Sequence, residues 1–357
     1  KNKAKSLSLT MSSKKVTKCA LLGVGLTLGY KYYCKKNAPS NREKREEKKL
    51  DCPFVVIEDE MYQIKEDGVN ASMNVTAYEG ELLPPFLSAK GIKWLNNNFK
   101  TNKLDVFIDT YAKSGTTLTI KLVHQILSTS QQKIASSDEK CMSDPWRAVP
   151  WIEADVSQEL FRNKVEKPEN FMKFIADSNK NESYRIWKSH MSFRNLIQNI
   201  DSNGECKVIH TLRNPKAVFC SYLSFFEKEP LVKYRGDKDT FFQWFCDGTV
   251  VHSNYWDHEL EWIKAAKQRD NILLITFEEI VKNPIQSISK VSKFLNVSLN
   301  QEQIEDIADA ISFKKMKEAN QSSGAKILMN KGGVDRWKKV LSPSQSARMD
   351  RITRAKF

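Results

Sequence analysis

Three short apolar runs recur along the chain, and each is followed by a segment with helical spacing of its apolar residues. The first run covers residues 104–111 and precedes 116–127, where leucine and isoleucine recur on one side. The others cover 206–212, before a helix expected over 216–226, and 272–277. Apolar runs bounded by turn residues are typical of buried strands. This alternation predicts an α/β fold, a three-layer sandwich with a central, mainly parallel sheet that binds ligands at its strands' carboxyl ends.

The loop after the first run has the residue types of a phosphate-binding turn. Gly115 allows close backbone approach, Thr116 and Thr117 add hydroxyl groups, and Lys113 adds a positive charge. The N–H groups of this loop, with Ser114, and of the following helix N-terminus would point into one concavity. The Walker A pattern places its lysine after the glycine, whereas Lys113 precedes Gly115, which argues against a P-loop kinase. The loop is therefore predicted to be P-loop-like but not that of a nucleoside triphosphatase.

A second candidate anion site follows the second predicted strand. Arg213 ends that strand, Pro215 suits the first turn of the next helix, and Ser221 lies eight residues after the arginine. A guanidinium fork can bind phosphate bidentately, and a serine hydroxyl can add one hydrogen bond. Taken alone, a structural arginine with a buried helical serine explains this pattern equally well.

Lys188 and His190 are two residues apart at the end of a predicted strand, so their side chains should point the same way. Of the other histidines, His210 is expected in a core strand. His252 and His258 are six residues apart, about 240° around a helix, and would make a poor metal pair. No zinc-binding motif is found in the sequence, and no metal is expected.

These motifs together resemble those of the cytosolic sulfotransferases. Lys-Ser-Gly-Thr-Thr at 113–117 is similar to their phosphosulfate-binding loop, Arg213 to Ser221 to their 3′-phosphate motif, and Lys-Ser-His at 188–190 to their Lys-Thr-His. The matches occur in family order from about residue 90 to residue 357.

The resemblance implies transfer of a sulfuryl group from 3′-phosphoadenosine 5′-phosphosulfate (PAPS), leaving adenosine 3′,5′-bisphosphate (PAP), without a metal. The resemblance makes His190 the general base. It implies that Lys113 stabilises the leaving phosphate oxygen and that Lys188 lies beside the sulfuryl oxygens. Leu118 replaces the tryptophan that stacks on adenine in the family. The remaining donor-binding positions are Phe277 (tyrosine in the family), Ser312, Phe313, Asn330 (arginine in the family), Lys331 and Gly332.

The resemblance further implies a small hydroxylated acceptor, or an amine. Trp151 and Phe193 would line its site, although both are equally well explained as core aromatics. Two alternatives stay open: a membrane-tethered enzyme that sulfates glycans or proteins, and a catalytically weak homologue that only binds the nucleotide. The family's dimer motif is degraded at 338–347, which leaves a homodimer open.

The net charge of +14 is concentrated at the N-terminus, because residues 1–50 hold 14 Lys/Arg and 3 Asp/Glu. Residues 1–50 are therefore interpreted as a basic tail with a charged linker, and 51–357 as the sulfotransferase domain, with no nucleic-acid partner. The apolar stretch within 18–31 is shorter than the roughly 17 to 25 residues of a spanning helix, so only weak membrane association is considered. Seven cysteines without regular spacing favour a cytoplasmic location, with a membrane-tethered form as the alternative.

Overall fold

We describe a computed structural model of the chain. The structure describes residues 7–11, 33–34, 57, 60–66, 70–135, 149–228, 231–319 and 333–357. The apolar stretch at 18–31 and the predicted donor-binding residues Asn330, Lys331 and Gly332 lie outside this part of the chain.

The centre of the molecule is a four-stranded parallel sheet with strand order β7-β6-β8-β9. The register places Asp109, at the end of β6, beside Ser189 of β7 and His210 of β8. The carboxyl ends of these strands therefore lie together, as the sequence predicts. The strands are β6 (Asp105–Asp109), β7 (Arg185–Ser189), β8 (Lys207–Leu212) and β9 (Ile272–Thr276).

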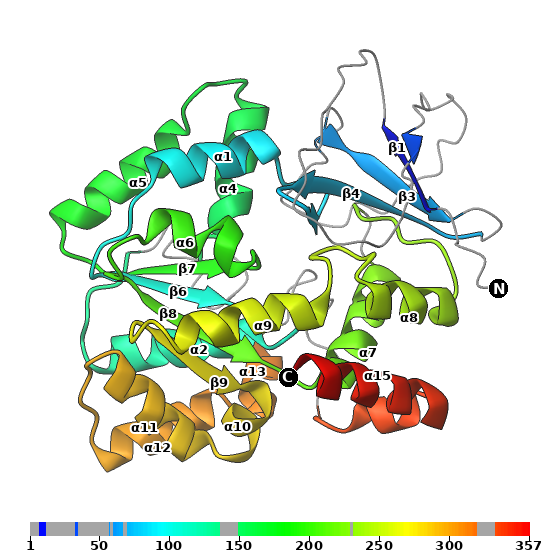
Figure 1. Ribbon diagram of the computed structural model, residues 1–357. Coiled ribbons are helices and arrows are strands. Elements are labelled where there is room, and N and C mark those ends of the chain that lie inside the picture. The colour runs from blue at the N-terminus through cyan, green and yellow to red at the C-terminus, as the bar shows by residue number, and fades with distance from the viewer. Residues whose placement is uncertain are drawn as a thin grey trace.

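The sheet is covered by helices on both faces, which makes three layers (Figure 1). Because side chains alternate along a strand, Val106 and Ile108 pack into one core while Phe107 packs into the other. The first core is closed by α2 (Thr116–Thr129), α11 (Pro284–Phe294) and α12 (Gln301–Ala310). The second is closed by α1 (Ala89–Asn98), α4 (Ile152–Arg162), α5 (Glu169–Lys180), α6 (Ile197–Ile200) and the end of α9 (Tyr255–Ala266). The predicted α/β sandwich is confirmed.

A third core lies beside the main sheet, between a smaller sheet and a group of helices (Figure 1). The smaller sheet has the order β2-β1-β3-β4-β5, with β1 and β2 parallel and the other pairs antiparallel. Its strands are β1 (Leu7–Met11), β2 (Tyr33–Cys34), β3 (Tyr62–Glu66), β4 (Ser72–Tyr78) and β5 (Glu81–Leu83). The helices are α7 (Pro215–Phe226), α8 (Lys238–Asp247) and α15 (Pro343–Lys356), with the start of α9.

Short helical segments complete the described part of the chain: the 3-10 helices η3 (Phe193–Asn195) and η4 (Arg336–Lys339), and the α-helices α10 (Phe277–Lys282) and α13 (Phe313–Ala319). Within that part, none of the helices combines the length and the apolarity that crossing a bilayer requires.

Two local predictions are wrong. The third strand stops at Thr276, and Phe277 opens α10, because Thr276 accepts from the Glu279 N–H at 3.0 Å and Glu279 accepts in return at 2.7 Å. This reciprocal capping box starts a helix. His252 does not share a helix with His258, because α9 begins only at Tyr255 and His252 lies in a preceding turn with φ +63°.

Candidate active site

The lysine-containing loop joins the end of β6 to the start of α2. The Tyr111 hydroxyl anchors it by donating to the Ser253 carbonyl at 3.0 Å. Gly115, at the N-cap of α2, has φ +122°, and a Cβ added there would lie 2.7 Å from the Phe277 ring. Only glycine suits this position, since other residues rarely adopt such a φ and lack the space. Lys113 itself has φ +71°.

This loop presents hydrogen-bond donors that the described residues leave without partners. Ser114 is completely buried, and its Oγ has no hydrogen-bond partner there. The N-terminus of α2 has no side-chain cap. A buried donor without a partner is costly, so such groups indicate a ligand that supplies acceptors. Phosphate oxygens at a helix N-terminus fit both features.

Arg213 links this loop to two other strand ends. Its Nη1 donates to the Lys113 carbonyl at 2.9 Å, and its guanidinium lies 4.1 Å from the centre of the Phe277 ring. Its Nε has no partner among the described residues. Ser221 is half-buried on α7, the helix that follows Arg213. The loops after β6 and β8 and the start of α10 after β9 thus meet at one place.

The electrostatics of Lys113 differ from those of a surface lysine. Burial lowers the pKa of its ammonium to about 7, and the positive charge of Arg213 contributes to the shift. Two cations held this close together favour an anion between them, although the Glu278 carboxylate already offsets part of the charge of Arg213.

His190 follows β7 and is buried. Its Nδ1 lies 2.8 Å from the Thr110 carbonyl oxygen, which can only accept, so the proton sits on Nδ1 and leaves the Nε2 lone pair free. Burial, and then the charge of Lys188, hold the pKa of His190 well below its ordinary value. The imidazole is therefore neutral near pH 7, as a general base must be.

Lys188 and Trp151 lie beside this histidine. The Lys188 ammonium is 3.8 Å from the centre of the Trp151 indole. The indole and the His190 ring form a T-shaped pair with a centroid distance of 5.0 Å. Burial lowers the pKa of Lys188 to about 7, while Glu153 and Asp155 act in the opposite direction. Lys188, His190 and Trp151 are thus brought together.

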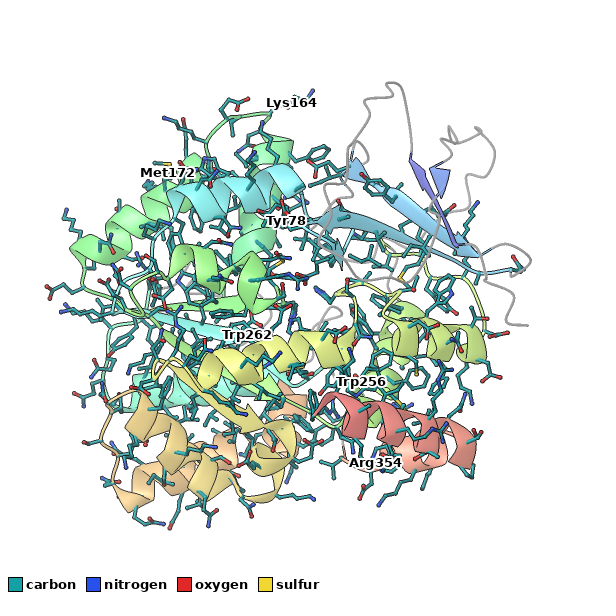
Figure 2. All side chains as sticks on the ribbon, viewed as in Figure 1. Tyr78, Lys164, Met172, Trp256, Trp262 and Arg354 are labelled. Atoms are coloured by element: carbon teal, nitrogen blue, oxygen red, sulfur yellow. The ribbon has the colours of Figure 1, made fainter. Side chains whose placement is uncertain are left out.

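Other predicted residues lie in less specific surroundings. Phe193 is half-buried and packs against Trp262 of α9, with 5.5 Å between the ring centroids. Figure 2 labels Trp262 on α9, where this helix passes over the sheet. The Ser312 hydroxyl accepts from the Lys315 N–H at 3.3 Å, at the start of α13. Phe313 leaves 47% of its surface exposed.

Two buried carboxylates near the site escaped sequence reasoning. Glu153 accepts from the His190 N–H at 2.9 Å, and burial raises its pKa to about 8. Glu81 accepts from the Ser192 hydroxyl at 2.8 Å and from Asn195 at 2.9 Å, and burial raises its pKa to about 7. No local pattern marks them, because apart from Trp151, which donates to Glu153, these partners come from distant segments.

Another group of polar residues is buried next to the site. Ligand atoms of His210, His258 and Glu259, all buried, lie within 4.8 Å of one another. His210 Nε2 and a Glu259 oxygen are 2.7 Å apart, a hydrogen-bond distance and closer than two ligands of one zinc ion would sit. We interpret the pair as an ion pair, consistent with the pKa of His210, which the carboxylates of Glu259 and Asp109 raise to about 9 against the effect of burial.

The model of the sulfotransferase domain matches residues 103–357, most of the chain and every strand of the central sheet. The chain belongs to the sulfotransferase family. This sulfotransferase is 27% identical over 294 residues to sulfotransferase 2A1 of Macaca fascicularis, covering 76% of this chain and 95% of that one. It is also 27% identical over 298 residues to a 3-beta-hydroxysteroid sulfotransferase of Cavia porcellus, covering 80% and 95%.

Solved structures agree with the fold. The structure of mouse sulfotransferase SULT7A1 complexed with PAP superimposes with a TM-score of 0.63 at 23% identity, covering 79% of this chain and 94% of the other. The resemblance inferred from the motifs is therefore confirmed, and the chain is a sulfotransferase enzyme.

Proposed function

We propose that this sulfotransferase moves the sulfuryl group of PAPS to a hydroxyl of a small, largely apolar acceptor. One observation carries the proposal: Thr110 joins the phosphate loop to the base. Its carbonyl holds His190 Nδ1 at 2.8 Å, and its hydroxyl lies 2.7 Å from that of Thr116 in the first turn of α2. An anion on α2 and an acceptor proton at His190 would thus meet at adjacent strand ends.

The groups of the site divide the tasks of this reaction among them. Lys113, Ser114 and the first amides of α2, with Thr116 and Thr117, bind the 5′-phosphate, and Arg213 and Ser221 bind the 3′-phosphate. His190 Nε2 takes the proton of the acceptor hydroxyl as the new S–O bond forms. Lys113 stabilises the charge on the phosphate oxygen whose bond to sulfur breaks, and Lys188 the charge on the sulfuryl oxygens.

The adenine would rest near α13 and α10. Phe313 exposes an unusually large aromatic surface for this protein, and the Phe277 ring lies directly over Gly115. Both rings offer stacking faces in place of the tryptophan that Leu118 replaces. Asn330, Lys331 and Gly332 are proposed to close over the 3′-phosphate on the strength of their motif alone.

The acceptor proposal rests on Trp151 and on the relatives. Trp151 contacts His190 and is 8% exposed, so an acceptor held there would meet an apolar wall. One relative is named for 3-beta-hydroxysteroids, and a solved neighbour, retinol dehydratase, contains androsterone with PAP. A hydroxylated, apolar small molecule of this kind is the proposed acceptor class.

Calorimetric titration of the full chain with PAP, without magnesium, tests the donor site. We expect Lys113→Ala and Arg213→Ala each to weaken binding about tenfold to a hundredfold, since a hydrogen bond to a charged group contributes roughly 1.5–3 kcal/mol. Lys133→Ala removes an exposed lysine just after α2 and should leave binding unchanged.

Binding of ATP with magnesium instead of PAP would contradict the proposal. PAP binding without transfer to any hydroxylated acceptor would indicate the nucleotide-binding homologue instead.

A further inference from the structure

Glu153 stands in the first turn of α4 with no exposed surface. One of its oxygens, Oε1, accepts from three groups: the Trp151 indole N–H at 2.5 Å, the His190 backbone N–H at 2.9 Å and, more weakly, the Ser189 hydroxyl at 3.4 Å. A single carboxylate oxygen therefore ties the segment that begins α4 to the end of β7.

The same two segments are joined along their backbones. The Lys188 N–H donates to the Pro150 carbonyl at 2.9 Å, and Trp151 pairs with Lys188 as an isolated parallel bridge. Trp151 in turn contacts both Lys188 and His190 through its indole. Glu153 thus lies where the proposed acceptor wall and the proposed base are held together.

Stability alone does not explain a carboxylate at this position. Its other oxygen, Oε2, is buried and accepts no hydrogen bond within the described part of the chain. Burying a carboxylate that is only partly hydrogen-bonded is costly, and such costs are typical of sites where charge serves function. The nearby charge that Glu153 favours is the ammonium of Lys188.

We propose that Glu153 is a positioning residue of the transfer reaction, which fixes the peptide of His190 and supplies the counter-charge of Lys188. The proposal rests on the proposed function for its kinetic consequences. It assigns a role to a residue that touches neither donor nor acceptor and acts through its neighbours.

The charges around Lys188 determine the expected sign of a pH effect. Glu153 and Asp155 of α4 raise its pKa, Lys113 of the β6–α2 loop lowers it, and His190 and His252 also face it. Burial raises the pKa of Glu153 to about 8, so its charge is complete only above that pH and supports the Lys188 ammonium most in the alkaline range. Glu153→Gln removes this support and therefore lowers the pKa of Lys188 further below about 7. A lysine is charged only below its pKa. In a variant without the Glu153 charge, activity that needs the Lys188 ammonium is therefore lost at a lower pH than in wild type.

The test compares Glu153→Gln, which removes the charge at nearly constant shape, with Glu159→Gln on the same helix. Glu159 also accepts from backbone N–H groups, those of Asn170 at 2.7 Å and Phe171 at 3.1 Å, but toward α5. The measurements are PAP affinity, and kcat and KM against pH with PAPS and the 3β-hydroxysteroid dehydroepiandrosterone as the acceptor probe.

For Glu153→Gln we expect PAP affinity within threefold of wild type and a kcat lowered roughly tenfold to a hundredfold, the scale that a small misplacement of reacting groups costs. KM should change less than kcat, and the alkaline limb of the kcat profile should move to lower pH. Glu159→Gln should reproduce wild type. An unchanged kcat and an unmoved alkaline limb in Glu153→Gln would overturn the proposal.

A second arm needs neither donor nor acceptor. Two-bond ¹H–¹⁵N NMR of the histidine side chains, assigned with His190→Gln, reports which ring nitrogen of His190 carries its proton. Wild type should show the Nδ1-protonated form alone, whereas Glu153→Ala, which removes the acceptor of the His190 N–H, should show a mixture. Identical His190 signals in the two proteins would overturn the positioning role, even if wild type bound no PAP and the donor proposal failed.

Discussion

The two ends of β6 and β7 hold very different polar groups. At the amino ends, Asp105 is saturated: Arg185 donates to both of its oxygens at 2.6 Å, and the Trp187 indole and the Asn102 N–H add bonds at 2.7 and 2.8 Å. At the carboxyl ends, Lys113 and Lys188 have lowered pKa values, and Ser114 has a buried hydroxyl without a partner in the described chain.

The difference shows how one pair of strands serves two purposes. A buried ion pair whose hydrogen bonds are complete has nothing left to offer a ligand, and it fixes the strands against each other. A buried lysine with a lowered pKa is costly to keep charged in the empty protein, and a bound anion relieves that cost. Stability is concentrated at one end of the strands, and the capacity to bind and react at the other.

The largest effect is expected when the proposed base at the carboxyl ends of the strands is removed. Replacing His190 by glutamine should lower kcat by roughly 10²–10⁴-fold, the contribution of a positioned general base. The melting temperature should change little, because the Nδ1–H bond to Thr110 can be replaced by the glutamine amide. Steady-state kinetics and a thermal melt of the same preparation check this, and a kcat near wild type would show that His190 is not the base.

Removing the ion pair at the amino ends of the strands should lower stability and leave kcat nearly unchanged. Asp105→Ala leaves the Arg185 guanidinium, 1% exposed as a residue, without its carboxylate, with the Asn179 amide oxygen as its remaining acceptor at 2.8 Å. The change should cost about 3–5 kcal/mol of the free energy of unfolding. Denaturant titration measures it, with the exposed Asp177→Ala on α5 as the control. The kcat of the protein that remains folded should stay close to wild type; a lowered kcat at full stability would contradict the division of roles.

The smallest expected effect is a pH dependence of PAP binding, which tests whether the lysine at the carboxyl end of β6 titrates when the anion binds. Because the pKa of Lys113 is lowered to about 7 and a bound polyanion raises it again, PAP binding above pH 7 takes up a proton. The Kd for PAP should therefore increase between pH 7 and 9, by at most about tenfold per pH unit for one linked proton. Lys113→Arg keeps its charge and should flatten this dependence. A wild-type Kd independent of pH would show that Lys113 does not titrate on binding.

The sequence predicted those parts of the site that are contiguous in the chain. The strand at β6, the loop at 113–117 and the helix after it form one short segment whose pattern carries its own structure. The same holds for Arg213 and α7, where Asn214 caps the helix and Pro215 opens it. Motif spacing was sufficient for these elements.

The rest depends on packing between distant segments. Glu153 and His190 are 37 residues apart, and Glu81 and Ser192 are 111 apart, so no local pattern reports their contacts. The misplaced start of α10 is a different kind of error, since Thr276 and Glu279 form a capping box that is visible in the sequence. For His252, helical spacing was applied to a residue that precedes its helix.

The last helix, α15, supports two helices that carry the site, so the site depends on the C-terminal end of the described chain. Lys216, in the first turn of α7, pairs with Asp350 of α15 at 2.7 Å, and the Trp256 indole of α9 donates to Thr353 at 2.9 Å. Figure 2 labels Trp256 next to α15. A shortened protein ending before Ser342 would retain every proposed donor- and acceptor-binding residue. It would nevertheless lose the contacts by which α15 supports α7, which follows Arg213, and α9, which follows His252. The smallest functional fragment is therefore expected to include α15, which begins more than a hundred residues after Arg213 and Ser221.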